Sequence, residues 1–228
     1  MEKLGDVRKL WETSFEVWMS ESGQWSENHV RAALASHAPR QLSHPGSEAA
    51  VAMILRFAGQ AEVLLIRRSE QNGDPWSGHM ALPGGRREPA DPSCLETAIR
   101  ETREEVGIEL THQGELLGRL DDVTAIARGR PLDLVIVPFV FALREPVALT
   151  PSGEVDEALW TRLEPLAAGR AATTRPYLYQ DQTLELPAFR VGPHVVWGLT
   201  YHMLTVFFAL LRGEPPPASP RRPALGQR

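Results

Sequence analysis

Apolar positions along the chain follow two different spacings, and each spacing predicts its own kind of structure. Residues 4–19 place Leu, Val, Phe and Trp at helical intervals, which favours an amphipathic helix. Ser26 is placed to cap a second helix over residues 27–37. From Glu48 onward, short apolar runs alternate with turn residues, as is typical of strands. The change of pattern therefore predicts a helical extension over residues 1–45 in front of a strand-rich domain.

The strand-rich domain is expected over residues 46–212. Apolar runs on either side of Ala58–Gly59–Gln60 predict a hairpin of two strands. Pro92–Val106 has a helical stripe and is followed by Gly107, a residue suited to a helix C-cap. A last helix is expected over Trp197–Leu211, and further strands in GELLGRL, DLVIVPFVFAL and LPAFRV, whereas EVDEALWTRL fits strand and helix alike. Strands interleaved with helices indicate a mixed α/β or α+β layer fold.

Composition narrows the class of protein. The net charge of −5 argues against a protein that coats nucleic acid, because such proteins usually carry a basic face. With Cys94 as the one cysteine there is no internal disulfide framework, so a cytoplasmic location is expected. Val195–Leu211 is the most apolar stretch, and it is shorter than the ~20 residues that a membrane span needs. The N-terminal residues do not resemble a secretory signal. We therefore expect neither a nucleic-acid nor a membrane partner.

The two ends of the chain are less informative. The Pro-rich residues 213–228 have too little apolar surface to order themselves, so a disordered tail is expected. The leading helices fit two arrangements, packing on the main domain or forming the surface of a homodimer.

Three glutamates gather in the segment RETREEVGI. Glu101 lies three and four positions before Glu104 and Glu105, so the three carboxylates share one helix face. Their charges repel, and the C-terminal end of a helix disfavours anions, so stability alone does not account for them. Mg²⁺ or Mn²⁺ would reverse the penalty, because both prefer oxygen ligands. The adjacent Gly84 and Gly85 would let a backbone carbonyl approach the same ions. A solvated helix face is the alternative interpretation.

Residues 85–108 resemble the Nudix box of the Nudix hydrolases, G-x5-E-x7-R-E-U-x-E-E-x-G-U, in which U is aliphatic. The matching residues are Gly85, Arg100, Glu101, Glu104, Glu105, Gly107 and Ile108. Asp91 stands where the family usually has Glu, eight residues rather than seven separate it from Arg100, and Thr102 occupies an aliphatic position. The resemblance implies an α/β/α sandwich with a mixed sheet, here with N-terminal helices added.

The resemblance also implies a role for each matching residue. Glu101 and Glu105 would be the main metal ligands, Glu104 a third ligand or a proton acceptor, and the Gly85 carbonyl a further ligand. Arg100 would orient the glutamates by ion pairing. The reaction would be a metal-dependent attack of water on the pyrophosphate of a nucleoside diphosphate derivative.

Family members often take a further catalytic carboxylate from a distal loop. The segment PSGEVDEALW offers Glu154, Asp156 and Glu157, and Glu154 is the residue that we favour. The alternative is that all three are ordinary surface acids, which are common in loops.

The stretch before the box resembles the motif of the coenzyme A diphosphatase subfamily, L-L-T-x-R-[SA]-x3-R-x3-G-x3-F-P-G-G. The matching residues are Leu64, Leu65, Arg68, Ser69, Gly78, Pro83, Gly84 and Gly85, but no arginine stands at the second arginine position. Arg67 and Arg68 are expected to contact phosphates, and His79 the substrate. Strand-end solvation and loop capping are the alternatives for these side chains.

The expected substrate is coenzyme A or an acyl-CoA, which would yield 3′,5′-ADP and (acyl-)4′-phosphopantetheine. The departures from the motif support a second hypothesis, a Nudix pyrophosphatase for an ADP-sugar, a dinucleotide or an oxidised nucleotide. A third is a ligand-sensing Nudix module without turnover, because a fold does not fix a function.

Overall fold

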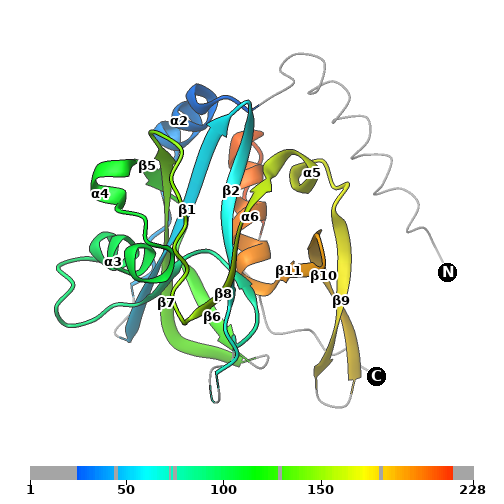
Figure 1. Ribbon diagram of the computed structural model, residues 1–228. Helices are drawn as coiled ribbons and strands as arrows, with labels where there is room; N and C mark the ends of the chain where they lie inside the picture. The colour runs from blue at the N-terminus through cyan, green and yellow to red at the C-terminus, as the bar shows by residue number, and fades with distance from the viewer. Residues whose placement is uncertain are drawn as a thin grey trace.

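The computed structural model describes residues 25–43, 46–71, 73, 76–127, 130–179 and 182–217. Within these residues the chain forms an eight-stranded mixed sheet, a three-stranded antiparallel sheet and the helices that pack on them (Figure 1). The amphipathic helix expected over residues 4–19 lies outside the described residues, and so does the end of the expected tail, residues 218–228.

The elements in chain order are α2 (Glu27–Ser36), β1 (Ser47–Ala58), β2 (Gln60–Arg68), β3 (Met80–Ala81), β4 (Gly84–Arg86), α3 (Cys94–Val106), α4 (Leu110–Gln113), β5 (Gly114–Arg119), β6 (Val123–Ala127), β7 (Arg130–Leu143), β8 (Val155–Arg162), α5 (Leu163–Ala167), β9 (Ala172–Tyr179), β10 (Gln182–Val191), β11 (His194–Trp197) and α6 (Gly198–Leu211). The ambiguous segment EVDEALWTRL is strand β8, with Leu163 starting the short helix α5. None of the helices in the described parts of the chain is long and apolar enough to cross a membrane.

Strand β1 is the organising element of the large sheet. It forms the expected hairpin with β2, in which Ala58 pairs with Gln60 around Gly59, a glycine at φ +82°. On its other side β1 runs parallel to β7, and it also pairs antiparallel with the short strand β4. The strand order is β3-β2-β1-β7-β5, with β8 on β2 and β6 on β7. Because parallel and antiparallel pairs coexist, the sheet is mixed, as expected.

Helices cover both faces of this sheet (Figure 1). Successive strand residues point to opposite faces, so each central strand contributes to two apolar cores. The core that packs against α2 and α6 contains from the central hairpin Met53, Leu55, Val63 and Leu65. The core under α3 and α4 contains Ala52, Ile54, Leu64 and Ile66. The central hairpin is therefore buried on both sides, which explains its nearly continuous apolar sequence.

Helix α2 answers part of the question about the leading helices. The Ser26 hydroxyl accepts a hydrogen bond from the backbone N–H of His29 at 3.2 Å, so the expected N-cap is confirmed. Val30 and Leu34 are buried in the core that contains α6. Arg31 also donates to Glu115 of β5 at 2.8 Å. This helix therefore packs on the main domain.

The smaller sheet, β9–β10–β11, was only partly expected. Strand β10 contains the predicted segment LPAFRV, but β9 and β11 were not predicted. Phe189, Val191 and Val196 anchor this sheet in the same core as α6. It lies beside β3 at the edge of the large sheet, because β11 contacts β3. The hydroxyl of Thr200, at the start of the helix α6 that follows β11, also donates to the carbonyl of Met80 in β3 at 3.1 Å.

Candidate active site

Gly84 and Gly85 bring the backbone of β4 directly against two neighbouring groups. At Gly84, which has φ +150°, an added Cβ would lie 2.2 Å from the backbone oxygen of Ala50 in β1. At Gly85 an added Cβ would lie 2.4 Å from the carboxylate of Glu101 in α3. The first glycine therefore allows strand pairing, whereas the second lets a carboxylate of α3 pack against the strand backbone.

Glu105 is the most buried carboxylate of the cluster. Its residue is 2% exposed, and its carboxylate accepts a hydrogen bond from the Gly84 N–H at 2.8 Å. Arg68 Nη1 lies 3.4 Å from the other carboxylate oxygen. Burial raises the pKa of Glu105 to about 8, despite the opposing effects of the Gly84 N–H and Arg68. The negative charges of Glu101 and Glu154 raise it further, so this carboxylate lacks sufficient positive charge around it.

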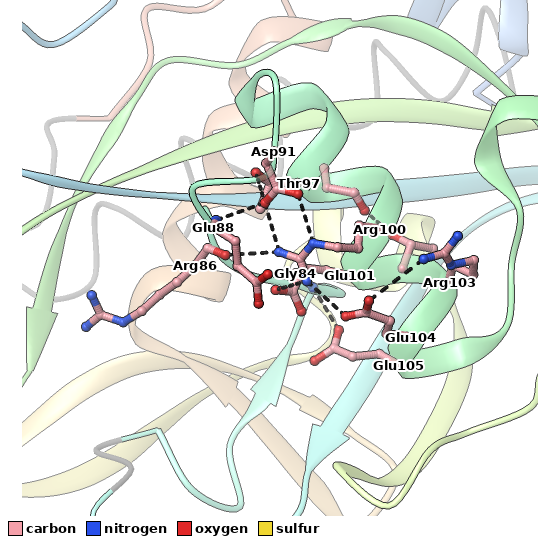
Figure 2. Close-up of polar contacts among 12 residues, drawn as sticks. Gly84, Arg86, Glu88, Asp91, Thr97, Arg100, Glu101, Arg103, Glu104 and Glu105 are labelled. Carbon is pink, nitrogen blue, oxygen red and sulfur yellow. Dashed lines mark hydrogen bonds and ion pairs between the residues drawn. The ribbon is translucent and has the colours of Figure 1, made fainter.

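Arg100 is held by Asp91 from the loop before α3 (Figure 2). The guanidinium donates through Nε at 3.0 Å and through Nη2 at 2.9 Å to the two oxygens of Asp91. The hydroxyl of Thr97 and the backbone N–H of Glu88 also donate to Asp91, each at 2.9 Å. Hydrogen bonding to Arg100 holds the pKa of Asp91 well below its usual range. Asp91, which stands where the Nudix box usually has Glu, is thus the partner of Arg100. The sequence analysis did not predict this role.

The other edge of Arg100 faces the glutamates of α3. Its Nη1 lies 3.0 Å from Glu101 Oε1 and 2.9 Å from Glu104 Oε2 (Figure 2). Glu101 is mostly buried, and burial is the main cause that raises its pKa. The Glu104 side chain is 50% exposed, so it lies at the rim of the cluster. Arg100 therefore links the buried Asp91 to two of the three α3 glutamates.

The loop before β8 is fastened to the C-terminal end of α3. The backbone N–H of Thr150 donates to the carbonyl of Val106, and that of Ser152 donates to the carbonyl of Glu105, each at 2.9 Å. This loop brings Glu154 close enough for its charge to raise the pKa of both Glu101 and Glu105. Glu154 itself is exposed.

The two other acids of that segment make contacts elsewhere. Asp156 pairs with Arg67 at 2.6 Å, and Glu157 accepts from His194 at 2.7 Å. The structure therefore groups Glu154, rather than Asp156 or Glu157, with the glutamates of α3.

The residues expected to contact substrate divide into two groups. Arg68 lies at the carboxylate cluster, beside Glu105. Arg67 instead contacts Asp156, and its second guanidinium nitrogen lies 3.7 Å from Glu70. The His79 ring packs against the ring of Trp197 with centroids 4.8 Å apart, and the His79 carbonyl accepts a hydrogen bond from the backbone N–H of Arg68 at 3.0 Å.

The carboxylate cluster fits a divalent cation in the chemistry of its donors. Glu101, Glu105 and the backbone of Gly85 offer oxygen ligands, which Mg²⁺ and Mn²⁺ prefer. The absence of a side chain at Gly85 lets the Glu101 carboxylate approach the backbone of β4, and burial together with the charges of Glu101 and Glu154 disfavours the charged form of Glu105 that a cation would stabilise. Across the described residues, no three Asp, Glu, His or Cys side chains are already gathered as a ligand set. The donor atoms are therefore of the kind that these ions prefer. In the structure, Arg100 pairs with Glu101, and Arg68 and the Gly84 N–H contact Glu105.

Three comparisons report which known proteins this chain is similar to. The profile of the NUDIX domain matches residues 46–182. Mitochondrial coenzyme A diphosphatase NUDT8 of Homo sapiens is 32% identical over 181 residues, which are 76% of this chain and 73% of that protein. The uncharacterized protein C14C4.10c of Schizosaccharomyces pombe is 45% identical over 108 residues, 46% of this chain and 32% of that protein. Among solved structures, an Ap4A hydrolase binary complex from C. elegans has 27% identity and a TM-score of 0.44, covering 52% of this chain and 81% of that chain.

Proposed function

Because the chain belongs to the Nudix family of hydrolases, we propose that it hydrolyses the pyrophosphate bond of coenzyme A or an acyl-CoA. The family match and the mixed sheet between helices confirm the Nudix-type fold expected from residues 85–108. Members of this family act on pyrophosphate bonds of small nucleotide derivatives and generally use a divalent metal. The products here would be 3′,5′-ADP and (acyl-)4′-phosphopantetheine.

Two independent observations support coenzyme A as the substrate. The human relative that aligns with 76% of this chain is named a coenzyme A diphosphatase. The segment from Leu64 to Gly85 carries most positions of the motif of that subfamily. Arg68, which belongs to this motif, is the arginine that lies at the carboxylate cluster.

The carboxylate cluster supplies the proposed metal ligands. Glu101, Glu105 and the Gly85 carbonyl would hold Mg²⁺ or Mn²⁺, with Glu104 as a third carboxylate ligand or as the proton acceptor. When bound, the ion neutralises charge on the pyrophosphate and acidifies a water. The observation that carries this assignment is the approach of two α3 carboxylates to the Gly84–Gly85 backbone: an added Cβ at Gly85 would lie 2.4 Å from the Glu101 carboxylate, and Glu105 accepts from the Gly84 N–H at 2.8 Å.

The remaining residues would position these groups and the substrate. Asp91 holds Arg100, and Arg100 in turn fixes the carboxylates of Glu101 and Glu104. A water oxygen attacks one phosphorus, the bond from that phosphorus to the bridging oxygen breaks, and the bridging oxygen leaves on the other phosphate. Glu154 is the second candidate for accepting the proton of the water. Arg68 would contact a phosphate once Glu105 is shared with the ion.

The test is hydrolysis of coenzyme A by the purified protein with Mn²⁺. Release of both 3′,5′-ADP and 4′-phosphopantetheine is expected, and Glu101→Gln should lower the rate by about 100-fold or more. A second readout needs no turnover. Mn²⁺ should raise the melting temperature of the wild type more than that of Glu101→Gln, because a ligand that binds the folded state stabilises it. Product release no greater than in Glu101→Gln would refute the proposal.

A pyrophosphatase for an ADP-sugar, a dinucleotide or an oxidised nucleotide is the second candidate. Arg67 forms an ion pair with Asp156, and the second arginine of the coenzyme A motif is missing, so fewer arginines than in that motif are available to contact phosphates. A substrate panel separates the two, and a higher kcat/KM for ADP-ribose than for coenzyme A would favour this candidate. Tight nucleotide binding without metal-dependent hydrolysis would favour the ligand-sensing module.

The compartment and the oligomeric state remain part of the proposal. A cytoplasmic location agrees with the single cysteine, whereas the human relative is named as mitochondrial. Fractionation of the native cells would distinguish these compartments. A homodimer would be recognised by its mass in sedimentation.

A further inference from the structure

Four side chains meet where the three-stranded sheet approaches the loop before Gly84. Trp197, at the end of β11, is the centre of this aromatic–arginine cluster, whose other members are His79, Arg175 and Tyr177. The His79 and Tyr177 ring centroids lie 4.8 and 5.6 Å from that of Trp197. The guanidinium carbon of Arg175 lies 4.5 Å from the same ring centroid.

The cluster is open to solvent on part of its surface. All four residues are intermediate in exposure, so none is sealed in the core. Arg175 and Tyr177 are two positions apart on β9 and therefore share a face of the small sheet. Among the described residues, Arg175 forms no ion pair. A guanidinium stacked on a ring keeps the N–H donors at its edge available, so Arg175 is suited to bind an anion.

Two chains of contacts connect this cluster with the carboxylates. In the first, the carbonyl of His79 accepts from the backbone N–H of Arg68 at 3.0 Å, and Arg68 lies beside Glu105. In the second, His194 of β11 donates to the carboxylate of Glu157 at 2.7 Å, and Glu157 comes three residues after Glu154 in the same segment. The small sheet therefore adjoins the side of the site formed by β2 and β8.

The chemistry of the cluster distinguishes the two halves of the proposed substrate. Aromatic side chains stack on nucleobases, and arginine recognises phosphate oxygens through its edge. The adenosine half of coenzyme A offers both a base and a 3′-phosphate. The pantetheine half offers neither a ring nor a further charge. The rings and the arginine thus match the nucleoside half.

We propose that the aromatic–arginine cluster binds the nucleoside half of the substrate, with Tyr177 and His79 contacting the base and Arg175 contacting an additional phosphate. This inference rests on the proposed function, since it assumes that a nucleotide pyrophosphate lies at Glu101 and Glu105. It assigns the β9–β11 sheet a part in substrate selection, in addition to its packing on α6.

The test measures binding of the two product halves, which needs no turnover. Calorimetry with 3′,5′-ADP and with 4′-phosphopantetheine is compared for the wild type, Arg175→Gln, Tyr177→Ala and Tyr177→Phe. Arg170→Gln is the matched control, because this exposed arginine lies just before β9 and contacts Glu164 instead. Melting temperatures verify that each variant folds, and Arg175→Gln still tests the cluster if Tyr177→Ala does not fold.

Arg175→Gln and Tyr177→Ala should weaken 3′,5′-ADP binding by about tenfold, as expected for loss of one stacked base or one charged contact. Tyr177→Phe and Arg170→Gln should stay within about twofold of the wild type. Binding of 4′-phosphopantetheine should not change. For Arg175→Gln the loss should be smaller with 5′-AMP, which lacks the 3′-phosphate. In turnover of coenzyme A, both weakened variants should raise KM with little change in kcat.

Unchanged 3′,5′-ADP affinity in both variants, or weakened 4′-phosphopantetheine binding instead, would overturn the inference. An equal loss for 5′-AMP and 3′,5′-ADP in Arg175→Gln would overturn the contact between Arg175 and the additional phosphate. Hydrolysis of coenzyme A by the wild type is measured in a separate assay. If the wild type does not hydrolyse it while the variants still lose nucleotide affinity, the proposed function fails and the nucleotide subsite stands.

Discussion

Asp91 and Arg100 form a two-point ion pair that joins the loop before α3 to the middle of that helix, with contacts of 3.0 and 2.9 Å. Asp91 is 7% exposed, and Thr97 and Glu88 donate two further hydrogen bonds to it. Arg100 is thereby fixed on one edge, while its other edge contacts Glu101 and Glu104.

Replacement of Asp91 should therefore affect both stability and turnover. Asp91→Asn removes the charge that compensates a largely buried arginine, so we expect a loss of about 2–4 kcal/mol in unfolding free energy. The rate should fall through kcat, because Arg100 would no longer hold Glu101. Asp91→Glu, which keeps the charge, should retain more activity. Denaturant titration and steady-state kinetics measure both effects, and full activity of Asp91→Asn would contradict the positioning role.

Gly84 and Gly85 should respond differently to the same added methyl group. Gly85→Ala meets only the flexible end of Glu101, so the fold should tolerate it, whereas the displaced carboxylate should lower activity by about 100-fold. Gly84→Ala meets the backbone of Ala50, so it should destabilise the protein by about 2 kcal/mol or more. Melting curves and kcat/KM separate the two cases. An active Gly85→Ala protein would argue against a metal site next to Glu101.

Glu154 is expected to contribute to catalysis through kcat. Glu154→Gln preserves size and removes the charge that reaches Glu101 and Glu105, so kcat should fall by about 100-fold if this carboxylate accepts the proton. Glu157→Gln is the matched control from the same segment, because Glu157 contacts His194 instead. If the control lowers kcat more than Glu154→Gln does, the distal carboxylate has been assigned to the wrong residue.

We expect the protein to lose stability on mild acidification because of the buried His202. Burial lowers the pKa of His202 from 6.5 to about 4, with a further lowering by Arg40 and an opposing effect of Asp121. Between these values the unfolded chain binds the proton and the folded chain does not, so unfolding becomes more favourable as pH falls from about 6.5 to 4. The contribution should be on the order of 1–2 kcal/mol.

Unfolding free energies at pH 7 and pH 5 measure this effect. His202→Leu removes the titrating ring, so its free energy of unfolding should change less between the two pH values than that of the wild type. An equal change in both proteins would assign the acid sensitivity to other groups.

The helix of the site could be predicted because its signals are local. Gly107 caps α3 as the sequence indicated, in the left-handed region at φ +74°, whereas the N-cap, Ser93, was not predicted. Glutamates at positions three and four apart must share a face in any helix. The pairing of Asp91 with Arg100 was not predicted, because it depends on the conformation of the loop before α3. There the Asp91 N–H donates to the Glu88 carbonyl at 3.0 Å, a turn that the sequence did not indicate.

Other parts of the fold depend on contacts that no local pattern encodes. Strand β9 contains Pro176 and alternates between exposed and half-buried positions, so it lacks the apolar signal of a core strand. The position of Glu154 is set by hydrogen bonds from Thr150 and Ser152 to the end of α3, more than forty residues earlier in the chain. The aromatic–arginine cluster likewise joins His79 to residues of β9 and β11.

The parallel pairing of β1 with β7 has a consequence for the order in which the site is assembled during folding. Ser47–Leu55 pairs with Leu134–Ala142, so a long intervening segment must close before this pairing forms. The hairpin and α3 depend on nearer contacts and can form earlier, since short loops close at lower entropic cost. Arg68 and the α3 glutamates can therefore meet before Glu154, which follows β7, arrives. A partly folded chain would hold the carboxylates of α3 without Glu154, so the proposed set of four carboxylates is complete only after the sheet closes.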